Sequence, residues 1–372
     1  MKIVYYTDQI HLHGGIERVL TNKANYWVNK KGYETHIITS EQKNNPPRYP
    51  LDKRVHLHDL AINYNRKLSY FNQSNFKKAF KHYFILKKKL REIKPDVIIV
   101  CNFAFDFYFI PFIFPSILKI KEFHSSRSFD NLKRKKNKSF LKYIYYAITD
   151  YIESKYDYIA LLTVDEIKYY KSNNTIVIPN ALSNYPEEVA LLDEKKVISA
   201  GRIAPVKGFE KLIEAWVFIK DKMPEWVLEI YGSGEKQYLF ELQNQINISN
   251  LQDRIILCGN TDSIELKMKD SSIFVMSSLT ECFPMVLLES LSCGLPVVSF
   301  DCPNGPRNII TNNEDGYLVE NQNSKDLANS LIRLMKDEKL RKAMGKKGKS
   351  NMKKYHPDIV MNLWEKIFIK KY

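Results

Sequence analysis

Short runs rich in β-branched and aromatic residues alternate along the chain with longer runs whose apolar residues recur every three to four positions. The first pattern predicts buried strands, and the second predicts amphipathic helices. Their regular alternation predicts parallel sheets covered by helices on both faces. The predicted strands are 2–7, 34–40, 96–102, 117–123, 158–163, 175–179, 196–201, 226–232, 254–259, 272–277 and 296–300. The predicted helices are 15–31, 74–93, 139–154, 164–171, 207–222, 235–247, 284–293, 324–336, 338–354 and 357–371.

The alternation is interrupted once, at residues 179–195, where a stretch rich in Pro, Asn and Ser lacks helical period. A chain of 372 residues is long enough for two domains of about 150 residues or more. We therefore expect two doubly wound α/β domains, at 1–180 and 181–355, followed by a helical segment at 356–372. Ligands of open parallel sheets bind beyond the carboxyl ends of the strands, so the loops after the strands carry the candidate chemistry.

The most apolar stretch, residues 97–120, is long enough to be considered as a membrane span. Asp106, Pro111 and Pro115 favour a buried strand, a short aromatic helix and a second strand instead, and a segment that dips into a membrane is the alternative. The chain begins on a strand-like run without the pattern of a secretory signal. Its five cysteines are scattered without a CxxC motif, which is typical of a reducing cytosol.

Charge is distributed unevenly along the chain. The chain carries 57 Lys+Arg against 42 Asp+Glu, a net charge of +15. Residues 1–180 contain 31 basic and 16 acidic residues, whereas residues 181–372 contain 26 of each. A basic first half predicts an anionic partner, either a membrane surface or a phosphorylated acceptor. Nucleic acid is not expected, because no recognition motif accompanies the charge.

Two loops that follow predicted strands carry candidate binding residues. Gly14 and Gly15 open a helix, where backbone N–H groups can approach an anion. Arg202 and Lys207 lie five residues apart in a Pro-containing loop just before another helix, which predicts a diphosphate clamp. The alternative for both loops is an ordinary turn with solvated charges.

The strongest single run is residues 277–310, in which Glu281 lies in a loop before a helix and Glu289 lies eight residues further on, inside it. Pro284 suits the first helical position and Gly294 suits the helix end. On an ideal helix, eight residues separate two side chains by about 12 Å along the axis. The two carboxylates therefore cannot form a close catalytic pair, and we expect them to address different parts of an elongated ligand.

Together these residues resemble the retaining glycosyltransferases of family 4, which have the GT-B fold. The resemblance is carried in the family's order by GGIERVL (14–20), EFHSS (122–126), VIPNA (177–181), GRIAPVKG (201–208), the Glu–seven–Glu run with CGLPVV (293–298), and NEDGYLV (313–319). It implies two Rossmann-like domains that face a cleft, with the C-terminal helix returning to the first domain. It also implies transfer of a hexosyl or N-acetylhexosaminyl unit from a nucleotide sugar, UDP-linked by family preference, to a glycan acceptor. Residues 299–310 resemble the branch that builds bacterial capsule, O-antigen and exopolysaccharide.

The resemblance also implies a role for each matching residue. Arg202 and Lys207 would hold the donor diphosphate, Glu289 the ribose, and Glu281 the transferred hexose. His124 would reach the hexose beside the reacting carbon. The remaining donor-binding positions implied are Gly15, Gly259, Asn260, Phe283, Pro284, Met285 and Val286.

No metal site and no cofactor are expected, because the chain has no DxD motif and the basic loop with helix N-termini can stabilise the leaving group. Cys282 and Asn308 depart from the family, which commonly has Gly and an acidic residue there. An epimerase of the same architecture and a catalytically inactive paralogue that serves as a binding subunit are the alternatives.

Two stretches concentrate the basic charge beside apolar residues at helical spacing, residues 76–91 and residues 132–148. We expect them to bind the anionic inner face of the cell membrane, where a lipid-linked glycan acceptor would be presented to a cytoplasmic, peripheral enzyme. The alternative is that both apolar stripes face the core of the domain and the lysines are only solvated.

Overall fold

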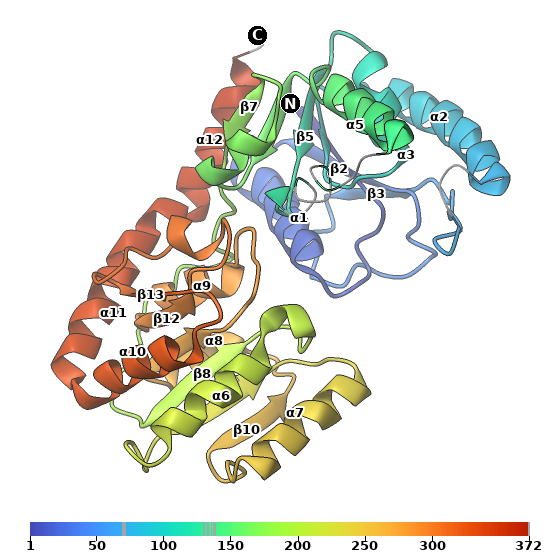
Figure 1. The fold of residues 1–372 in the computed structure, drawn as a ribbon. Helices are drawn as coiled ribbons and strands as arrows, with labels where there is room; N and C mark the ends of the chain where they lie inside the picture. Colours follow the sequence, from blue (N-terminus) through green and yellow to red (C-terminus); the bar gives the residue numbers. More distant parts are fainter. Residues whose placement is uncertain (69–71, 129–130, 132–133, 135, 137–138, 371–372) are drawn as a thin grey trace. The chain divides into compact units, whose positions relative to one another are not determined.

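The computed structural model describes residues 1–68, 72–128, 131, 134, 136 and 139–370. The chain divides into two compact units, Met1–Ser183 with Pro357–Tyr372, and Asn184–His356. Each unit is a fully parallel sheet with helices on both faces, so the predicted pair of doubly wound domains is confirmed (Figure 1). The C-terminal helix belongs to the first unit.

The first unit has a seven-stranded sheet in the order β3-β2-β1-β4-β5-β6-β7. Helices α1 and α12 share a core with one face, through residues such as Tyr5, Trp27 and Trp364. Helices α2, α3 and α5 share a core with the other face, through residues such as Tyr6 and Phe107. The strands are β1 (Lys2–Thr7), β2 (Glu34–Thr39), β3 (His56–Asp59), β4 (Val97–Val100), β5 (Leu118–Glu122), β6 (Tyr158–Leu161) and β7 (Thr175–Val177), and the helices are α1 (Gly15–Tyr26), α2 (Gln73–Ile93), α3 (Phe105–Phe109), α5 (Phe140–Glu153) and α12 (Pro357–Ile369).

The second unit has a six-stranded sheet in the order β10-β9-β8-β11-β12-β13. One apolar core joins this sheet to α6, α7 and α10 and buries Trp216 completely. Helices α9 and α11 pack closely, since a Cβ on Gly348 would meet Leu291 at 2.8 Å. The strands are β8 (Lys196–Ala200), β9 (Val227–Tyr231), β10 (Ile255–Gly259), β11 (Ile273–Met276), β12 (Val297–Phe300) and β13 (Gly316–Val319), and the helices are α6 (Phe209–Ile219), α7 (Lys236–Ile248), α8 (Ile264–Lys269), α9 (Met285–Ser292), α10 (Ser324–Lys336) and α11 (Glu338–Met352).

The apolar stretch at 97–120 forms strand β4, the short helix α3 and strand β5, as predicted. Asp106 is fully buried in α3, where its carboxylate accepts a hydrogen bond from Asn102 Nδ2 at 3.2 Å. Among the helices that the structure describes, none is long and apolar enough to cross a membrane.

Helix α12 uses a narrower apolar stripe than the sequence suggests. Val360, Trp364 and Phe368 are buried at a spacing of four residues, whereas Ile359 and Leu363 of the same helix are exposed. The ammonium of Lys23 lies 4.2 Å from the centre of the Trp364 ring. This contact attaches the end of the chain to helix α1 of the first unit.

Candidate functional site

Two loops at the carboxyl ends of β8 and β11 bring Lys207 and Glu281 together in the second unit. Leu279 N donates to Val206 O at 2.9 Å, and Ser277 Oγ donates to Lys207 O at 3.0 Å. Lys207 Nζ consequently lies 2.5 Å from Glu281 Oε1. This ion pair joins the two residues to which the sequence assigns the diphosphate and the hexose.

Gly208 makes this approach of the two loops feasible. Its φ of +60° lies in the left-handed region, which glycine adopts without strain. A Cβ at this position would lie 2.3 Å from the carbonyl oxygen of Ser277. Any other residue would therefore push the Lys207 loop away from Glu281.

Glu281 is supported from its other side by the segment after β12. Its backbone forms a parallel bridge with Asn304, and a Cβ on Gly305 would meet Glu281 Cβ at 2.8 Å. Asn308, where the family commonly has an acidic residue, donates from its side-chain amide to the carbonyl oxygen of Asn304. The departure at Asn308 thus supports the loop that backs Glu281.

Helix α9 begins at Met285, with Pro284 at the N-cap rather than at the first helical position. Leu287 N, the third N–H of this helix, donates to Pro284 O at 3.0 Å. N–H groups at the start of a helix otherwise have no partner within it and can bind an anion or a hydroxyl. The side chain of Phe283 is buried and packs edge-on against Tyr355, with ring centres 5.7 Å apart. Only backbone groups of Phe283 are therefore available to a ligand.

The other predicted donor residues lie on three elements of the second unit. Arg202 follows β8, is exposed, and has no ion pair among the residues the structure describes. Glu289 lies inside α9 and is half-buried. Gly259 ends β10 with a φ of +70°, and Asn260 follows it, exposed.

The first unit contains a cavity of about 410 Å³ at the carboxyl ends of β1, β4 and β5. His124 lines it together with Ile16 and Glu17 from the first turn of α1, so the structure brings His124 close to the start of the helix that Gly15 opens. A Cβ on Gly14 would meet Glu17 Oε2 at 2.1 Å, whereas Gly15 has open space around it. Of the two glycines, Gly14 is the one where a Cβ would require the flexible end of the Glu17 side chain to move.

His124 is 5% exposed and lies against a buried carboxylate, with His124 Nε2 3.5 Å from Glu122 Oε1. Burial nevertheless lowers the pKa of His124 to about 4, and the nearby Glu122 only partly opposes this effect. The imidazole is therefore neutral near pH 7. Its Nε2 is buried beside Glu122 and has no hydrogen-bond partner among the described residues.

Several cavity residues and their supports escaped the sequence analysis. Glu122 forms a buried ion pair with Lys23 of α1, and Cys101 Sγ lies 3.7 Å from its other oxygen. Lys121 lines the cavity and donates to the carbonyl oxygens of Val100 and Glu122, while burial lowers its pKa to about 8. The run LKIKE, with three charged residues in a strand, was the available signal for these groups.

Arg127 also lines the cavity and was not predicted. Its guanidinium donates to Glu153 Oε2 at 2.5 Å and lies 4.3 Å from the centre of the Tyr170 ring. Ser126 Oγ and the backbone N of Arg127 both donate to the buried carboxylate of Glu166. The EFHSS motif is therefore held by buried charges on both sides.

Comparison with known proteins identifies the chemistry of these two units. Residues 184–351 match the family described as "Glycosyl transferases group 1". An uncharacterized glycosyltransferase of Haemophilus influenzae is 28% identical over 370 residues, covering 98% of this chain and 99% of that relative. The chain is a glycosyltransferase with the GT-B fold. The sequence-based prediction of this fold and activity is confirmed.

Two further proteins are similar to this glycosyltransferase. The N-acetylgalactosamine-N,N'-diacetylbacillosaminyl-diphospho-undecaprenol 4-alpha-N-acetylgalactosaminyltransferase of Campylobacter jejuni is 32% identical over 182 residues, 49% of this chain and 48% of that relative. The crystal structure of Staphylococcus aureus TarM with fondaparinux, alpha-GlcNAc-glycerol and UDP superposes with a TM-score of 0.75 over 99% of both chains. At 18% identity, the second similarity is one of fold.

Proposed function

We propose that this glycosyltransferase moves a hexosyl or N-acetylhexosaminyl unit from a UDP-sugar to a glycan acceptor carried on a lipid diphosphate, with retention of configuration and without a divalent metal. The observation that carries the proposal is the Lys207–Glu281 ion pair at the carboxyl edge of the second sheet. An ammonium and a carboxylate that neutralise each other in the free site can separate to meet a ligand that offers both charges and hydroxyls. A nucleotide sugar is such a ligand.

In the proposed complex, Lys207 turns from Glu281 to the diphosphate, joined by the exposed guanidinium of Arg202 and the N-terminus of α9. Glu281 then accepts hydrogen bonds from hexose hydroxyls, and Glu289 binds the ribose. Negative charge grows on the diphosphate as the bond from its oxygen to the anomeric carbon breaks. Fixed cations and backbone N–H groups stabilise that charge. In other transferases a metal ion stabilises it.

Retention is what the resemblance to the family implies, and the proposed arrangement bears only on how it is achieved. No carboxylate is assigned to the reacting carbon, and the neutral imidazole of His124 offers a hydrogen bond rather than a negative charge. The acceptor oxygen would therefore attack from the face that the diphosphate leaves, and its proton would pass to a phosphate oxygen of the leaving group.

A nucleotide-sugar panel tests donor and mechanism together. Calorimetry should show binding of UDP above GDP and ADP, and transfer with the preferred UDP-sugar should proceed in saturating EDTA. NMR of the product should show an α-linkage from an α-linked donor. Activity restored only by Mg²⁺ or Mn²⁺, or a β-linked product, would contradict the proposal. Binding of the donor without turnover would favour the inactive-paralogue alternative.

We also propose that the first unit docks on an anionic membrane through α2 and α5. Both helices pack against α3, so they lie on the same face of the first sheet. Their apolar stripes are exposed rather than buried, as Phe84 (64% exposed) and Leu141 (77% exposed) illustrate. The exposed apolar residues are Phe76, Phe80 and Phe84 on α2, and Phe140, Leu141, Tyr143, Ile144, Tyr145, Ile148 and Tyr151 on α5.

Positive charge accompanies this apolar surface. Lys77, Lys81 and Lys88 are exposed on α2, and Lys142 is exposed on α5. Aromatic and aliphatic side chains beside lysines suit the headgroup region, where apolar groups insert and ammonium groups meet anionic lipids. The predicted basic run at 132–138 includes Leu132, Lys133, Lys135, Asn137 and Lys138, which lie outside the described residues.

A further inference from the structure

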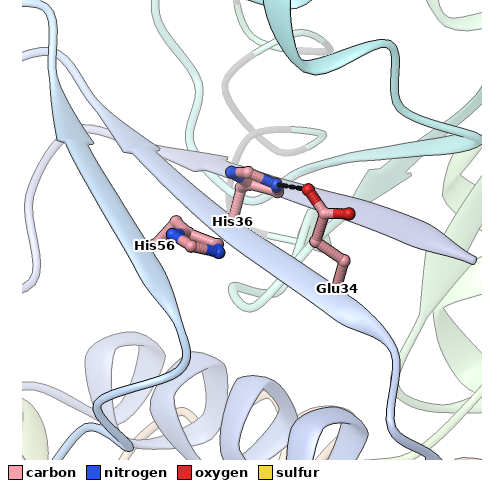
Figure 2. Close-up of side chains that lie close together, drawn as sticks. All are labelled: Glu34, His36 and His56. Carbon is pink, nitrogen blue, oxygen red and sulfur yellow. Dashed lines mark hydrogen bonds and ion pairs between the residues drawn. The ribbon is translucent and has the colours of Figure 1, made fainter.

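Two adjacent parallel strands at one edge of the first sheet place imidazoles and a carboxylate side by side. Cα pairing sets His36 of β2 opposite His56 of the edge strand β3. Glu34 lies two residues before His36 and therefore shares its face of the sheet. Figure 2 shows the three side chains together, with Glu34 Oε1 3.0 Å from His36 Nε2. One ligand atom from each of the three residues lies within 4.8 Å of the other two.

We infer that Glu34, His36 and His56 form a binding site for a divalent transition metal ion, and we commit to Zn²⁺ as the ligand. Imidazole nitrogens and a carboxylate oxygen are the ligands that Zn²⁺ takes in proteins, at about 2.0–2.2 Å. Around one tetrahedral ion, neighbouring ligand atoms are about 3.3–3.6 Å apart at these bond lengths. Glu34 Oε1 and His36 Nε2, at 3.0 Å, need to separate only slightly to bind it. His56 is exposed and can close the remaining gap by a change of rotamer.

His58 is a hydrogen-bond partner for the ring nitrogen of His36 that does not face Glu34. Metal-bound histidines usually need such a partner to fix the orientation of the ring. His58 Nε2 lies 3.0 Å from His36 Nδ1, and the two rings are stacked at 14°. If His36 binds the ion through Nε2, its Nδ1–H donates to His58, which selects the required tautomer.

The nearby cation Lys2 pairs with one oxygen of Glu34 and leaves the other oxygen facing His36. Lys2 Nζ lies 3.1 Å from Glu34 Oε2, the oxygen that faces away from His36. Glu34 Oε1 remains directed at the imidazole. An ammonium this close weakens metal binding by charge repulsion, so its removal should strengthen the site.

The site is separate from the proposed transfer reaction. Glu34 and His56 are the first residues of β2 and β3, so the cluster lies at the amino-terminal half of the sheet. The cavity with His124 lies at the carboxyl ends of the strands. Zn²⁺ here would link the four-residue edge strand β3 to its only sheet neighbour, β2, and so stabilise this edge of the first unit.

A second cluster, Cys101, Glu122 and His124, also places three ligand atoms within 4.8 Å of one another. It is a poorer zinc site, because the ammonium of Lys23 pairs with Glu122 Oε1, the same oxygen that faces His124, whereas Lys2 pairs with the oxygen of Glu34 that faces away from His36. Burial also raises the pKa of the Cys101 thiol, whereas zinc binds the thiolate. The experiment must nevertheless distinguish the two clusters.

Zinc titration of the untagged full chain tests the inference, by calorimetry and by the thermal unfolding midpoint. The parent should bind one Zn²⁺ and unfold at a higher temperature with it. His56→Gln and Glu34→Gln replace exposed side chains and should weaken binding at least tenfold and abolish the thermal shift, whereas Lys2→Gln should bind more tightly. His13→Gln, at another exposed histidine, should behave as the parent.

Three results would overturn the inference: no zinc bound by the parent, equal binding by His56→Gln, or loss of zinc in Cys101→Ser with retention in His56→Gln. Because the readouts are zinc affinity and thermal stability, none of these results depends on transferase activity.

Discussion

The two units share a parallel α/β architecture but differ in how many charged side chains they bury. The first unit buries charged side chains at the carboxyl edge of its sheet, among them Lys23, Lys121, Glu122 and Arg127. In the second unit, the buried charged residues among those described are Asp315 and Arg341. Lys207 and Glu281 are instead half-buried, and Arg202 is exposed.

This difference reflects what each site must do. Burying a charged side chain costs free energy unless an opposite charge compensates it. The buried charges of the first unit therefore pair with one another, and this pairing holds His124 in place. A site that receives a charged diphosphate needs cations whose solvation can be exchanged for the ligand. The second unit accordingly keeps its cations at the surface, with an internal carboxylate as the temporary partner of Lys207.

The largest expected effect tests the surface of the first unit. Changing Lys77, Lys81 and Lys88 to Glu should lower partition onto anionic vesicles more than 100-fold, because each lysine near the surface contributes about 1 kcal/mol. Liposome flotation at low and high salt measures it, and binding should fall with salt. The matched control changes Lys339, Lys342 and Lys346 of the neutral second unit to Glu and should float as the parent does. Equal flotation on neutral and anionic vesicles would contradict the docking proposal.

The second prediction concerns the ion pair of the second unit. Lys207→Ala should lower kcat about 100-fold, or about 3 kcal/mol, because the diphosphate loses a cation as its charge develops. Lys211→Ala, on α6 and paired with Glu214, is the matched control and should keep full activity. Steady-state kinetics with the preferred donor measures both. If the two variants were equally active, Lys207 would have no part in the transfer.

A smaller effect is expected at Glu289. Glu289→Ala should weaken binding of free nucleotide about tenfold, about 1.4 kcal/mol, by removing a charged hydrogen-bond acceptor from the ribose. Calorimetry with UDP measures it, and the exposed Glu241 of α7, changed to Ala, serves as the control. Unchanged affinity in Glu289→Ala would remove the ribose assignment.

The last effect, measured on stability rather than on activity or binding, is a pH dependence that belongs to the first unit. Burial lowers the pKa of His82 to about 3, and its ring accepts or donates hydrogen bonds to Tyr6 and Tyr64. Between pH 6.5 and 3 the unfolded chain binds a proton there that the folded unit does not, so this contribution to stability falls as pH falls. The excess stability of the parent over His82→Asn should therefore shrink from pH 7.5 to pH 5.

Thermal unfolding at the two pH values measures this difference. A stability difference independent of pH would show that His82 is not held neutral. Since the single histidine of the second unit is His356, the transition of that unit provides an internal comparison within the same scan.

Most of the predicted elements were found within one or two residues of their expected ends, but three elements were missed. Strand β3 (HLHD) has one aliphatic residue and lies at a sheet edge, so no apolar run marks it. Strand β13 begins at Gly316, and α8 has only six residues. The helix predicted to run to residue 31 changes to a π-helix at Trp27. Each miss is a short or irregular element that tertiary contacts hold in place.

The sequence by itself determined the alternation of strands and helices, and it placed Arg202, Lys207 and Glu281 in loops after strands, with Glu289 inside the following helix. Strand polarity sends such loops to one edge of a parallel sheet, and local pattern is sufficient for that inference because it depends only on near neighbours in the chain. That these residues meet a nucleotide sugar is what the family resemblance implies.

Only the tertiary structure decided which groups touch. The pairing of Lys207 with Glu281 joins residues 74 positions apart, and that of Lys23 with Glu122 joins residues 99 apart. The cluster of Glu34, His36 and His56 depends on the register of an edge strand that has no apolar signature. Register and long-range contact arise from packing of the whole unit, and no local pattern along the chain encodes them.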